Sequence, residues 1–279
     1  MRVSRTSFGF GIVPSFDSTA ARSRFTEACE LLSRQLGVVI YPHQALNYRD
    51  LAEGIERGTL GLAWLPPMLA IELEDRRQVE PIALPVRRGT TSFQSAIIAH
   101  RGAAKSLDDL RGKRVAWVDR SSAAGYVVPR MHLVGAGFDV RTLFSSESFA
   151  GTHDRVVDMV VSGRADVGAT FCTMDPRTLR VLQAGWTAPD GTSPKPVDVV
   201  ALTAPIPNDA IFAHVSVPTD VRAKLISVLL SPDAKLRDAI DFVLRAEAFR
   251  PATSAHFEPL RRMIAAATSR GEAPPSSRR

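Results

Sequence analysis

Cysteine is scarce in this sequence. The 279 residues contain two cysteines, Cys29 and Cys172, which lie far apart and form no CxxC pair. A disulfide framework or a zinc site needs more thiols at closer spacing, so the sequence predicts neither, and no other metal site is predicted. Both cysteines are expected to be small hydrophobic residues of the core.

Long apolar runs are also missing. No stretch reaches the roughly 18 apolar residues that a membrane-spanning helix needs, so no direct membrane insertion is predicted. The N-terminal stretch MRVSRTSFGFGIVPSF contains basic residues. No apolar run of about 7 to 15 residues follows them, so no secretory signal is visible. A cytoplasmic location is therefore expected if Met1 is the authentic start.

The sequence motifs of several enzyme classes do not occur. There is no GxSxG, no HExxH, no phosphate-binding GxxxxGKS/T and no pair of carboxylates at a recognisable spacing. The FGFG stretch at 8–11 lacks the third glycine of a dinucleotide site. We therefore predict no catalytic residues and no cofactor.

The net charge of +6 would fit nucleic acid, an acidic membrane surface or an anionic small ligand as a partner. No helix-turn-helix precedes the first predicted strand, and no basic run is interleaved with aromatic residues, so no nucleic-acid partner is predicted. Arginine outnumbers lysine and is scattered along the chain, which favours a generally basic surface.

Strands and helices alternate along the chain. Apolar patterning predicts strands at 6–15, 38–44, 60–67, 79–89, 92–102, 114–118, 142–149, 165–171 and 197–217. It predicts helices at 18–37, 48–58, 106–113, 125–138, 152–164, 218–231, 234–244 and 258–270. The alternation indicates an α/β fold with mainly parallel sheets and right-handed crossovers. Residues 183–197 are expected to be a surface loop and 266–279 a disordered tail.

The stretch VAWVDRSSAAGYVVP, 115–129, joins a predicted strand to a predicted helix. A helix that begins at the carboxyl edge of a parallel sheet leaves its first N–H groups unpaired there, and its macrodipole favours an anion. Ser121 and Ser122 would add hydroxyl donors, and Ala123, Ala124 and Gly125 are small enough to let an oxyanion reach the backbone. An N-cap role explains the same serines, and both interpretations stay open.

Two further stretches place polar residues at turns. In GTHDRVV, Thr152, His153 and Asp154 start a predicted helix, so a second set of N-terminal amides could face the same region. His153 could also donate to an anion. In IPNDAIF, Asn208 and Asp209 lie at a turn beside a strand, where ordinary turn chemistry is the competing explanation.

The order of four stretches resembles a known family. YRDLAEGIERGTLGLAWLPP, SLDDLRGKRVAWVDRSSAAGYVVP, GTHDRVVDMVVSGRADVGAT and IPND resemble, in this order, the PhnD-like phosphate, phosphite and phosphonate substrate-binding proteins of ABC transporters. The resemblance runs from the first strand to about residue 235. It implies a type II periplasmic binding protein, with two α/β lobes, two crossover strands, a ligand cleft between the lobes and a periplasmic location.

The resemblance also implies site residues. Ser121 and Ser122 fall on the hydroxyl pair that binds the phosphonate oxygens in this family, and His153 falls on the histidine that completes the contact. Tyr48 falls on a tyrosine of the cleft. Asp209 falls on an acidic position that can accept a hydrogen bond from a protonated oxyanion or from a ligand ammonium.

Three positions depart from the family pattern. Ala123 stands where a third hydroxyl residue is usual, Phe93 where a second tyrosine is expected, and Gly61 where an aspartate often occurs. Lost side-chain hydrogen bonds weaken phosphonate binding, whereas the backbone amides are unaffected. The predicted ligand is a small oxyanion of the phosphonate, phosphite or phosphate class. The predicted ligand-binding residues are Tyr48, Phe93, Ser121, Ser122, Ala123, Thr152, His153 and Asp209.

The predicted lobes are 1–99 with 201–265, and 100–200. The predicted function is that of a non-enzymatic substrate-binding protein that closes around one anion and serves an ABC permease. One alternative is a cytosolic ligand-sensing module with a signalling partner. Another is a lyase or transferase acting on small carboxylates with the same fold, in which His153 and Asp154 or Asp209 would transfer protons.

Overall fold

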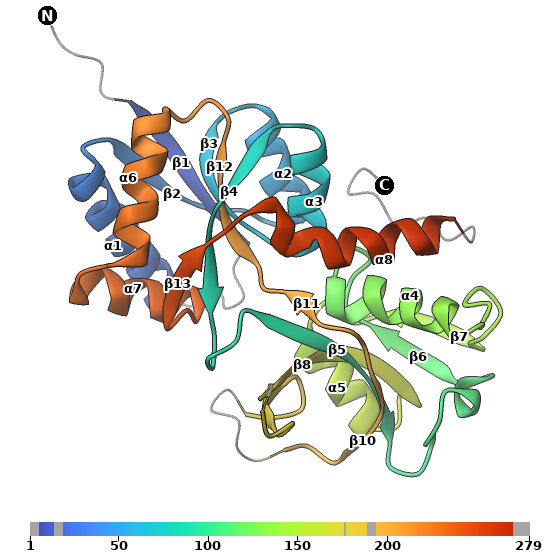
Figure 1. Cartoon of the computed structure of the whole chain (residues 1–279). Helices are drawn as coiled ribbons and strands as arrows, with labels where there is room; N and C mark the ends of the chain where they lie inside the picture. The colour runs from blue at the N-terminus through green and yellow to red at the C-terminus, as the bar shows by residue number, and fades with distance from the viewer. Residues whose placement is uncertain (1–5, 14–18, 176, 189–193, 270–279) are drawn as a thin grey trace, which may run out of the picture. The chain divides into compact units, whose positions relative to one another are not determined.

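The computed structural model describes residues 6–13, 19–175, 177–188 and 194–269 (Figure 1). They group into two compact units: unit 1 takes its residues from 1–91 and 208–257, and unit 2 from 92–207 and 258–277. The predicted lobes, 1–99 with 201–265 and 100–200, follow the same order of segments. The predicted first lobe extends to residue 265, whereas helix α8 (Glu258–Thr268) belongs to unit 2. The chain therefore passes between the units a third time, after residue 257. The lobe bounds themselves stay a prediction.

Unit 1 is built on a six-stranded sheet of order β13-β4-β12-β3-β1-β2. Strands β2 and β3 pair with β1 in parallel, whereas β12 runs antiparallel to β3 and β4, and β13 runs antiparallel to β4. The strands are β1 (Ser7–Ile12), β2 (Val39–Gln44), β3 (Leu60–Leu65), β4 (Val79–Val86), β12 (Ala210–His214) and β13 (Ala248–Pro251).

The helices of unit 1 are α1 (Thr19–Leu36), α2 (Tyr48–Glu56), α3 (Pro67–Asp75), α6 (Thr219–Leu230) and α7 (Ala234–Leu244), followed by the 3-10 turn η3 (Ser254–Phe257). Buried residues recur at helical spacing along α1, at Phe25, Cys29, Leu32 and Leu36, so one face of this helix packs into the core. The prediction that Cys29 is a core residue is confirmed, and burial raises the pKa of its thiol to about 12.

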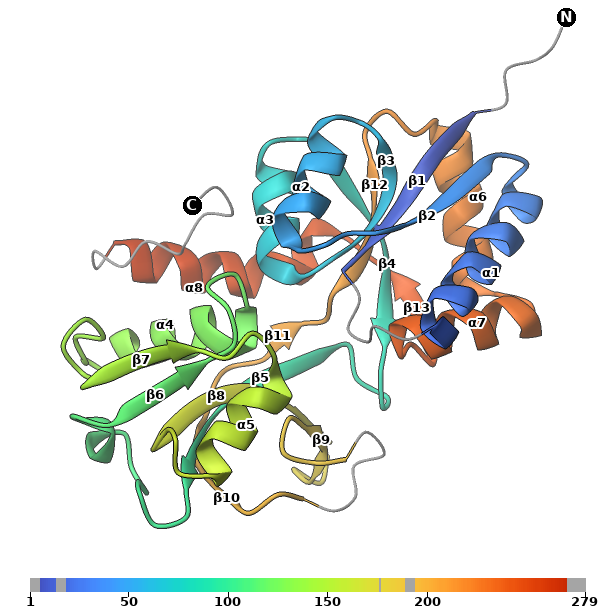
Figure 2. The same cartoon turned by 180° about the vertical axis from the view of Figure 1, so that it is seen from behind.

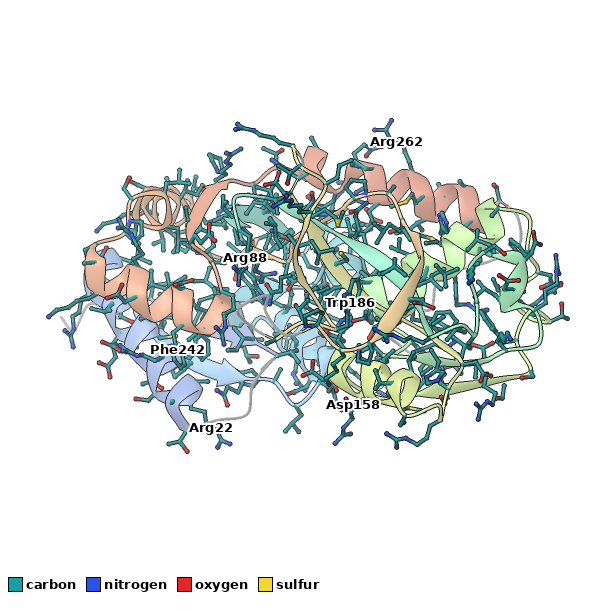
Figure 3. All side chains as sticks on the ribbon, turned by 90° about the horizontal axis from the view of Figure 1, so that it is seen from below. Arg22, Arg88, Asp158, Trp186, Phe242 and Arg262 are labelled. Carbon is teal, nitrogen blue, oxygen red and sulfur yellow. The ribbon has the colours of Figure 1, made fainter. Side chains whose placement is uncertain are left out.

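Unit 2 contains a second sheet of order β10-β5-β8-β6-β7, with β9 paired to β8 and β11 to β5. Its strands are β5 (Ser92–His100), β6 (Arg114–Trp117), β7 (Ser146–Phe149), β8 (Val167–Met174), β9 (Val181–Ala184), β10 (Val197–Leu202) and β11 (Ile206–Pro207). Besides α8, the helical segments are η1 (Asp108–Leu110), the π-helical turn η2 (Ala123–Val127), α4 (Val128–Gly135) and α5 (His153–Val161). Cys172 and Trp186, the latter labelled in Figure 3, lie buried in the core of this unit.

The expectation of mainly parallel sheets is wrong, because both sheets are mixed. Parallel pairs are confined to the alternating stretches, from β1 to β3 in unit 1 and from β6 to β8 in unit 2. A strand that re-enters a sheet after an excursion of the chain runs antiparallel to the strand beside it. The Asn208 backbone N–H donates to the Thr91 carbonyl at 2.9 Å, which places the start of β12 near the end of β4. Strand β12 therefore runs back along β4 in the antiparallel direction. Strand β10 likewise returns along β5.

Some predicted boundaries also need correction. The helix expected over 125–138 begins earlier, as η2, and ends as α4 at Gly135. Helix α8 extends to Thr268, so the tail does not begin at 266 as expected. Residues 270–279 of the expected tail lie outside the described residues, as do Pro14 and residues 189–193 of the expected loop. No helix in the described residues is long and apolar enough to cross a membrane.

The core of unit 1 explains one departure from the family pattern. A Cβ atom added to Gly61 of β3 would lie 2.4 Å from Cγ and 2.6 Å from Cβ of Phe8. Phe8 is itself buried in the core. An aspartate side chain therefore has no room at position 61, and the phenyl ring of Phe8 occupies that space instead.

We expect Gly61→Ala to lower the free energy of unfolding by about 1 to 3 kcal/mol, because an overpacked core forces its neighbours away from their preferred rotamers. Gly135→Ala is the matched control. Its added Cβ would meet no atom within 4 Å. Alanine also favours a helix over glycine by up to about 1 kcal/mol. Urea unfolding measures both changes, and a Gly61→Ala protein as stable as wild type would show that Phe8 moves aside freely.

Candidate functional site

The turn after β6 is shaped by Asp119. Its Oδ1 accepts hydrogen bonds from the backbone N–H of Ser121 at 2.8 Å and from the Ser121 hydroxyl at 2.5 Å. The Asp119 carbonyl accepts from the Ser122 N–H at 3.0 Å. The Ser121 hydroxyl proton is thus donated within the turn, so Ser121 shapes the site rather than offering a free donor.

Ser122 is buried and caps the helical segment that follows. Its Oγ accepts from the Gly125 N–H at 3.0 Å, and its carbonyl accepts from the N–H groups of Tyr126 and Val127. This is the N-cap role that the sequence left open, and it uses an oxygen lone pair of the hydroxyl. The hydroxyl proton is not used by that bond, so capping and donation to a ligand are compatible.

Small residues are required at this turn. A Cβ atom on Gly125 would lie 2.3 Å from Cγ2 of Val118 and 2.8 Å from the Ser122 Oγ. The Gly125 carbonyl in turn accepts from the Val118 N–H at 3.1 Å. The turn is also tied to the sheet, because the buried Ser95 hydroxyl donates to the Ala124 carbonyl at 2.6 Å.

The first backbone N–H groups of η2 have no acceptor in the part of the chain that the structure describes. Among the residues that the structure describes, none accepts a hydrogen bond from the N–H of Ala123 or Ala124. Both residues are buried, with 6% and 3% of their surfaces exposed. Buried N–H groups are satisfied by protein, water or ligand, so these two groups point to an acceptor from outside the chain.

A second helix begins beside the first. The N–H groups of Ala150 and Gly151 donate to the carbonyls of Trp117 and Val118, both at 2.8 Å, which places the loop before α5 against the end of β6. Thr152 caps α5, with its Oγ accepting from the Arg155 N–H at 3.4 Å. The N–H groups of His153 and Asp154 have no acceptor among the residues that the structure describes.

The topology brings these two helix starts together at one sheet edge. Strands β6 and β7 are parallel neighbours, and β6 also neighbours β8. The chain moves from β6 to β7 through α4 and back past β6 to β8 through α5, so right-handed crossovers place α4 and α5 on opposite faces (Figure 2). Ligands of open α/β sheets bind outside the carboxyl ends of strands at such a reversal.

His153 is half-buried and neutral. Its Nδ1 lies 3.0 Å from the Thr170 Oγ1, and its ring meets Phe171 edge-on at 5.2 Å. Burial lowers the pKa of His153 to about 4. An imidazolium is therefore not present between pH 5 and 8, and any contact with a ligand comes from the neutral ring.

The other predicted residues have different surroundings. Asp209 of unit 1 pairs with Arg87, with 3.7 Å between Oδ2 and Nη2, while Tyr48 is the first residue of α2. Phe93 lies on β5 of unit 2, opposite Ile206 of β11. The structure thus brings Ser121, Ser122, Ala123, Thr152 and His153 to one edge of unit 2, whereas Tyr48 and Asp209 belong to unit 1.

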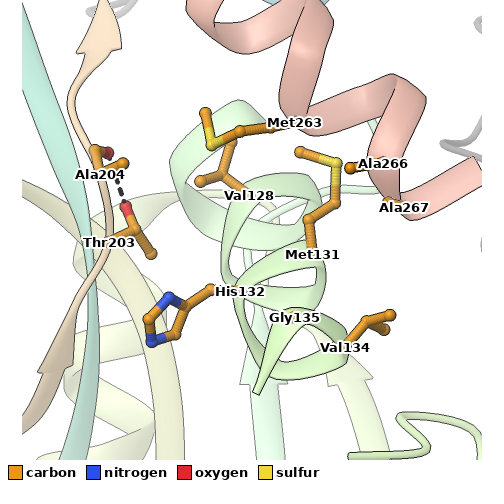
Figure 4. A pocket seen from close by; sticks show the side chains of 10 residues that line it. All are labelled: Val128, Met131, His132, Val134, Gly135, Thr203, Ala204, Met263, Ala266 and Ala267. Carbon is orange, nitrogen blue, oxygen red and sulfur yellow. Dashed lines mark hydrogen bonds between the residues drawn. The ribbon is translucent and has the colours of Figure 1, made fainter. Parts of the chain in front are cut away.

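A separate apolar pocket of unit 2 contains none of the predicted residues. It has a volume of about 230 Å³ and lies between α4, α8 and the Thr203–Ala204 stretch (Figure 4). Its lining includes Met131, His132 and Met263, and burial lowers the pKa of His132. This pocket is distinct from the turn that carries the unpaired N–H groups.

Sequence reasoning missed three residues that organise these sites. Asp119 had a signal, because an aspartate two residues before a serine is typical of an Asx turn. Thr170 gave no signal, because a single threonine within a strand does not show that it will contact His153 of α5. Arg87 gave none either, because its partner Asp209 is distant in sequence.

Comparison with known proteins places these features in a family context. A family model described as the periplasmic substrate-binding protein of a phosphonate ABC transporter matches residues 10–257. The chain is 25% identical over 179 residues to the phosphate-import protein PhnD of Mycolicibacterium smegmatis, covering 60% of this chain and 56% of that protein. It is 23% identical over 167 residues to the probable phosphite-binding protein PhnD1 of Prochlorococcus marinus, covering 57% and 56%. The chain therefore spans little more than half the length of these relatives.

Solved structures share the fold. A Xanthomonas citri protein bound to chloride matches with a TM-score of 0.77 at 20% identity, over 94% of this chain and 98% of that one. PhnD1 of Prochlorococcus marinus in complex with methylphosphonate matches with a TM-score of 0.73 at 20% identity, also over 94% and 98%. The predicted fold of the periplasmic-binding-protein class is confirmed by this likeness.

The neutral His153 makes stability depend on pH. Burial lowers its pKa from 6.5 to about 4, so the unfolded chain takes up a proton in this interval that the folded ring does not. Stability from this site is therefore complete above pH 6.5 and is lost as the pH falls toward 4. We expect wild type to lose roughly 1 to 2 kcal/mol more than His153→Gln between pH 7 and pH 5. Urea unfolding at the two pH values measures this difference, and equal losses would contradict the burial of a neutral ring.

Proposed function

The chain belongs to the family of periplasmic phosphonate substrate-binding proteins of ABC transporters, and on this premise we propose that it binds a small oxyanion and delivers it to such a transporter. The ligand class is that of phosphonate, phosphite and phosphate. The observation that carries the proposal is a set of four backbone N–H groups at the carboxyl ends of β6 and β7 that have no acceptor among the described residues.

The donors at this edge suit an acceptor-only ligand. The N–H groups of Ala123 and Ala124 begin one helical segment, and those of His153 and Asp154 begin another. Each helix start carries the positive end of a macrodipole, which attracts negative charge. A tetrahedral oxyanion has several oxygens with lone pairs, so one ligand can accept from both helix starts at once. The net charge of +6 adds a general attraction for anions.

The backbone origin of these donors explains why the departures at Ala123 and Phe93 are compatible with binding. Replacing a hydroxyl residue by Ala123 removes one side-chain donor, but the N–H of Ala123 itself is retained. A missing neutral hydrogen bond weakens binding by roughly 0.5 to 1.5 kcal/mol, whereas hydrogen bonds to a charged ligand contribute about 1.5 to 3 kcal/mol each. The amides therefore supply most of the affinity.

The proposed role is capture without chemical change. His153 is neutral and its Nδ1 lies beside the Thr170 hydroxyl, and the Ser121 hydroxyl proton is donated to Asp119. Neither arrangement activates a nucleophile toward a bound anion. Members of the family are periplasmic components of transporters, and we assign this chain the same location and an ABC permease as its partner.

The Ser122 hydroxyl is the side-chain donor to test. We expect Ser122→Gly to weaken binding of methylphosphonate by about 1 to 3 kcal/mol, as for loss of a donor to a charged acceptor. Glycine is chosen because it replaces serine at an N-cap with a loss of only a few tenths of a kcal/mol. Isothermal titration calorimetry measures the affinity, and thermal unfolding confirms that the variant is folded.

Ser162→Ala is the matched control, because Ser162 lies in the same unit at the opposite end of α5. Its affinity for methylphosphonate should equal that of wild type. If Ser122→Gly also binds with wild-type affinity, the hydroxyl serves only as a cap. If wild type binds none of phosphate, phosphite and methylphosphonate, the proposed function is refuted.

A further inference from the structure

In the described helix, the π-helical turn η2 leaves the Ala124 carbonyl without its usual N–H donor. The Val128 N–H, which would reach this carbonyl in an α-helix, donates to the Ala123 carbonyl instead. The next position along the helix is Pro129, which has no N–H. Ala124 is buried, so its carbonyl needs a donor from another element.

Ser95 of β5 supplies that donor. Its hydroxyl oxygen lies 2.6 Å from the Ala124 carbonyl oxygen, and because a carbonyl only accepts, the hydroxyl proton points to Ala124. Ser95 is fully buried. Its backbone N–H donates to the Thr203 Oγ1 at 3.0 Å, and its carbonyl accepts from the Thr203 N–H at 2.9 Å. The sheet of unit 2 therefore fixes the position of this donor.

The peptide group that Ser95 contacts reaches Ser122 at its other end. The carbonyl of Ala124 and the N–H of Gly125 belong to one planar peptide unit. The Gly125 N–H donates to the Ser122 Oγ at 3.0 Å. An N–H only donates, so the Ser122 hydroxyl accepts in this bond and its own proton is directed elsewhere. Two serine hydroxyls thus hold opposite ends of one peptide.

The hydrogen bonds of this chain of groups all run in one direction. Ser95 donates to the carbonyl, the Gly125 N–H donates to Ser122, and the Ser122 hydroxyl proton has no acceptor among the described residues. Donation into a carbonyl polarises the peptide, and bonds in such a chain strengthen one another. Ser122 is only 8% exposed, so this effect is not lost to solvent. The last proton of the chain is therefore made a better donor.

We propose that Ser95 is a positioning residue of the oxyanion site. It orients the Ser122 hydroxyl and strengthens its donation to the ligand through the peptide between Ala124 and Gly125. This inference rests on the proposed function, and it adds to the site a buried residue that acts without touching the ligand. All of its members belong to unit 2.

The first test needs no variant. The probe is whichever of phosphate, phosphite and methylphosphonate binds the wild-type protein most tightly by calorimetry. A ligand that accepts the Ser122 hydroxyl proton strengthens the bond from Gly125 to Ser122. The Gly125 amide proton should therefore move downfield in a ¹⁵N–¹H correlation spectrum, with the dissociation constant found by calorimetry, although this N–H donates inside the protein.

The second test removes the Ser95 hydroxyl. Ser95→Ala should weaken binding of the probe about three- to tenfold, the size of one neutral hydrogen bond, and should move the Gly125 amide proton upfield in the ligand-free protein. In a Ser122→Gly background, Ser95→Ala should change the affinity by less than about twofold, because the group through which it acts is gone. A general weakening of unit 2 would instead lower the affinity equally in both backgrounds.

Ser148→Ala is the matched control. The Ser148 hydroxyl also donates to a strand carbonyl of unit 2, that of Val115 at 3.2 Å. Its removal should leave both the affinity and the Gly125 signal as in wild type. Ser95→Cys keeps a weak donor in place of the hydroxyl and should bind the probe more tightly than Ser95→Ala.

Three results would overturn the inference and leave the proposed function standing. One is saturation of wild type with the Gly125 signal unmoved, which decides the matter even where Ser95→Ala fails to fold. The others are wild-type affinity in a folded Ser95→Ala protein and an equal loss of affinity in both backgrounds. Absence of binding of phosphate, phosphite and methylphosphonate to wild type would overturn the proposed function and this inference together.

Discussion

The site in unit 2 depends on backbone N–H groups that lack an acceptor in the described part of the chain. They lie at the carboxyl ends of β6 and β7. In the described residues, the N–H groups of Ala123, Ala124, His153 and Asp154 have no partner. Water can satisfy each group singly, whereas an oxyanion accepts from several at once and also neutralises the helix dipoles. The arrangement therefore selects for a compact acceptor with negative charge, and it does so without depending on which side chains surround it.

The remaining contacts of the site hold these donors in place. Asp119 fixes the turn, and the Ser95 hydroxyl fastens the Ala124 carbonyl to β5. Close packing of Gly125 against Val118 lets η2 start directly at the strand end. In this account unit 2 provides the affinity for the oxyanion.

Much of this was predictable from local patterns. Helical spacing predicted α1 and α5, and the small and hydroxylated residues after a strand predicted the turn at Ser121 and Ser122. The direction of β12 was not predictable, because it depends on where the chain re-enters a sheet. The neutral state of His153 and the pairing of Asp209 also depend on burial and on residues distant in sequence. Local patterns thus located the donors, whereas the charge states of the site required the tertiary structure.

The most direct measurement of the central claim is a ¹⁵N–¹H correlation spectrum of the protein titrated with methylphosphonate. Amide protons that donate to an oxyanion move downfield, and helix starts that bind the ligand move together with a single dissociation constant. The account predicts that the amide signals of Ala123, Ala124, His153 and Asp154 are among those that shift most. Saturation of binding with these four signals unmoved would contradict it.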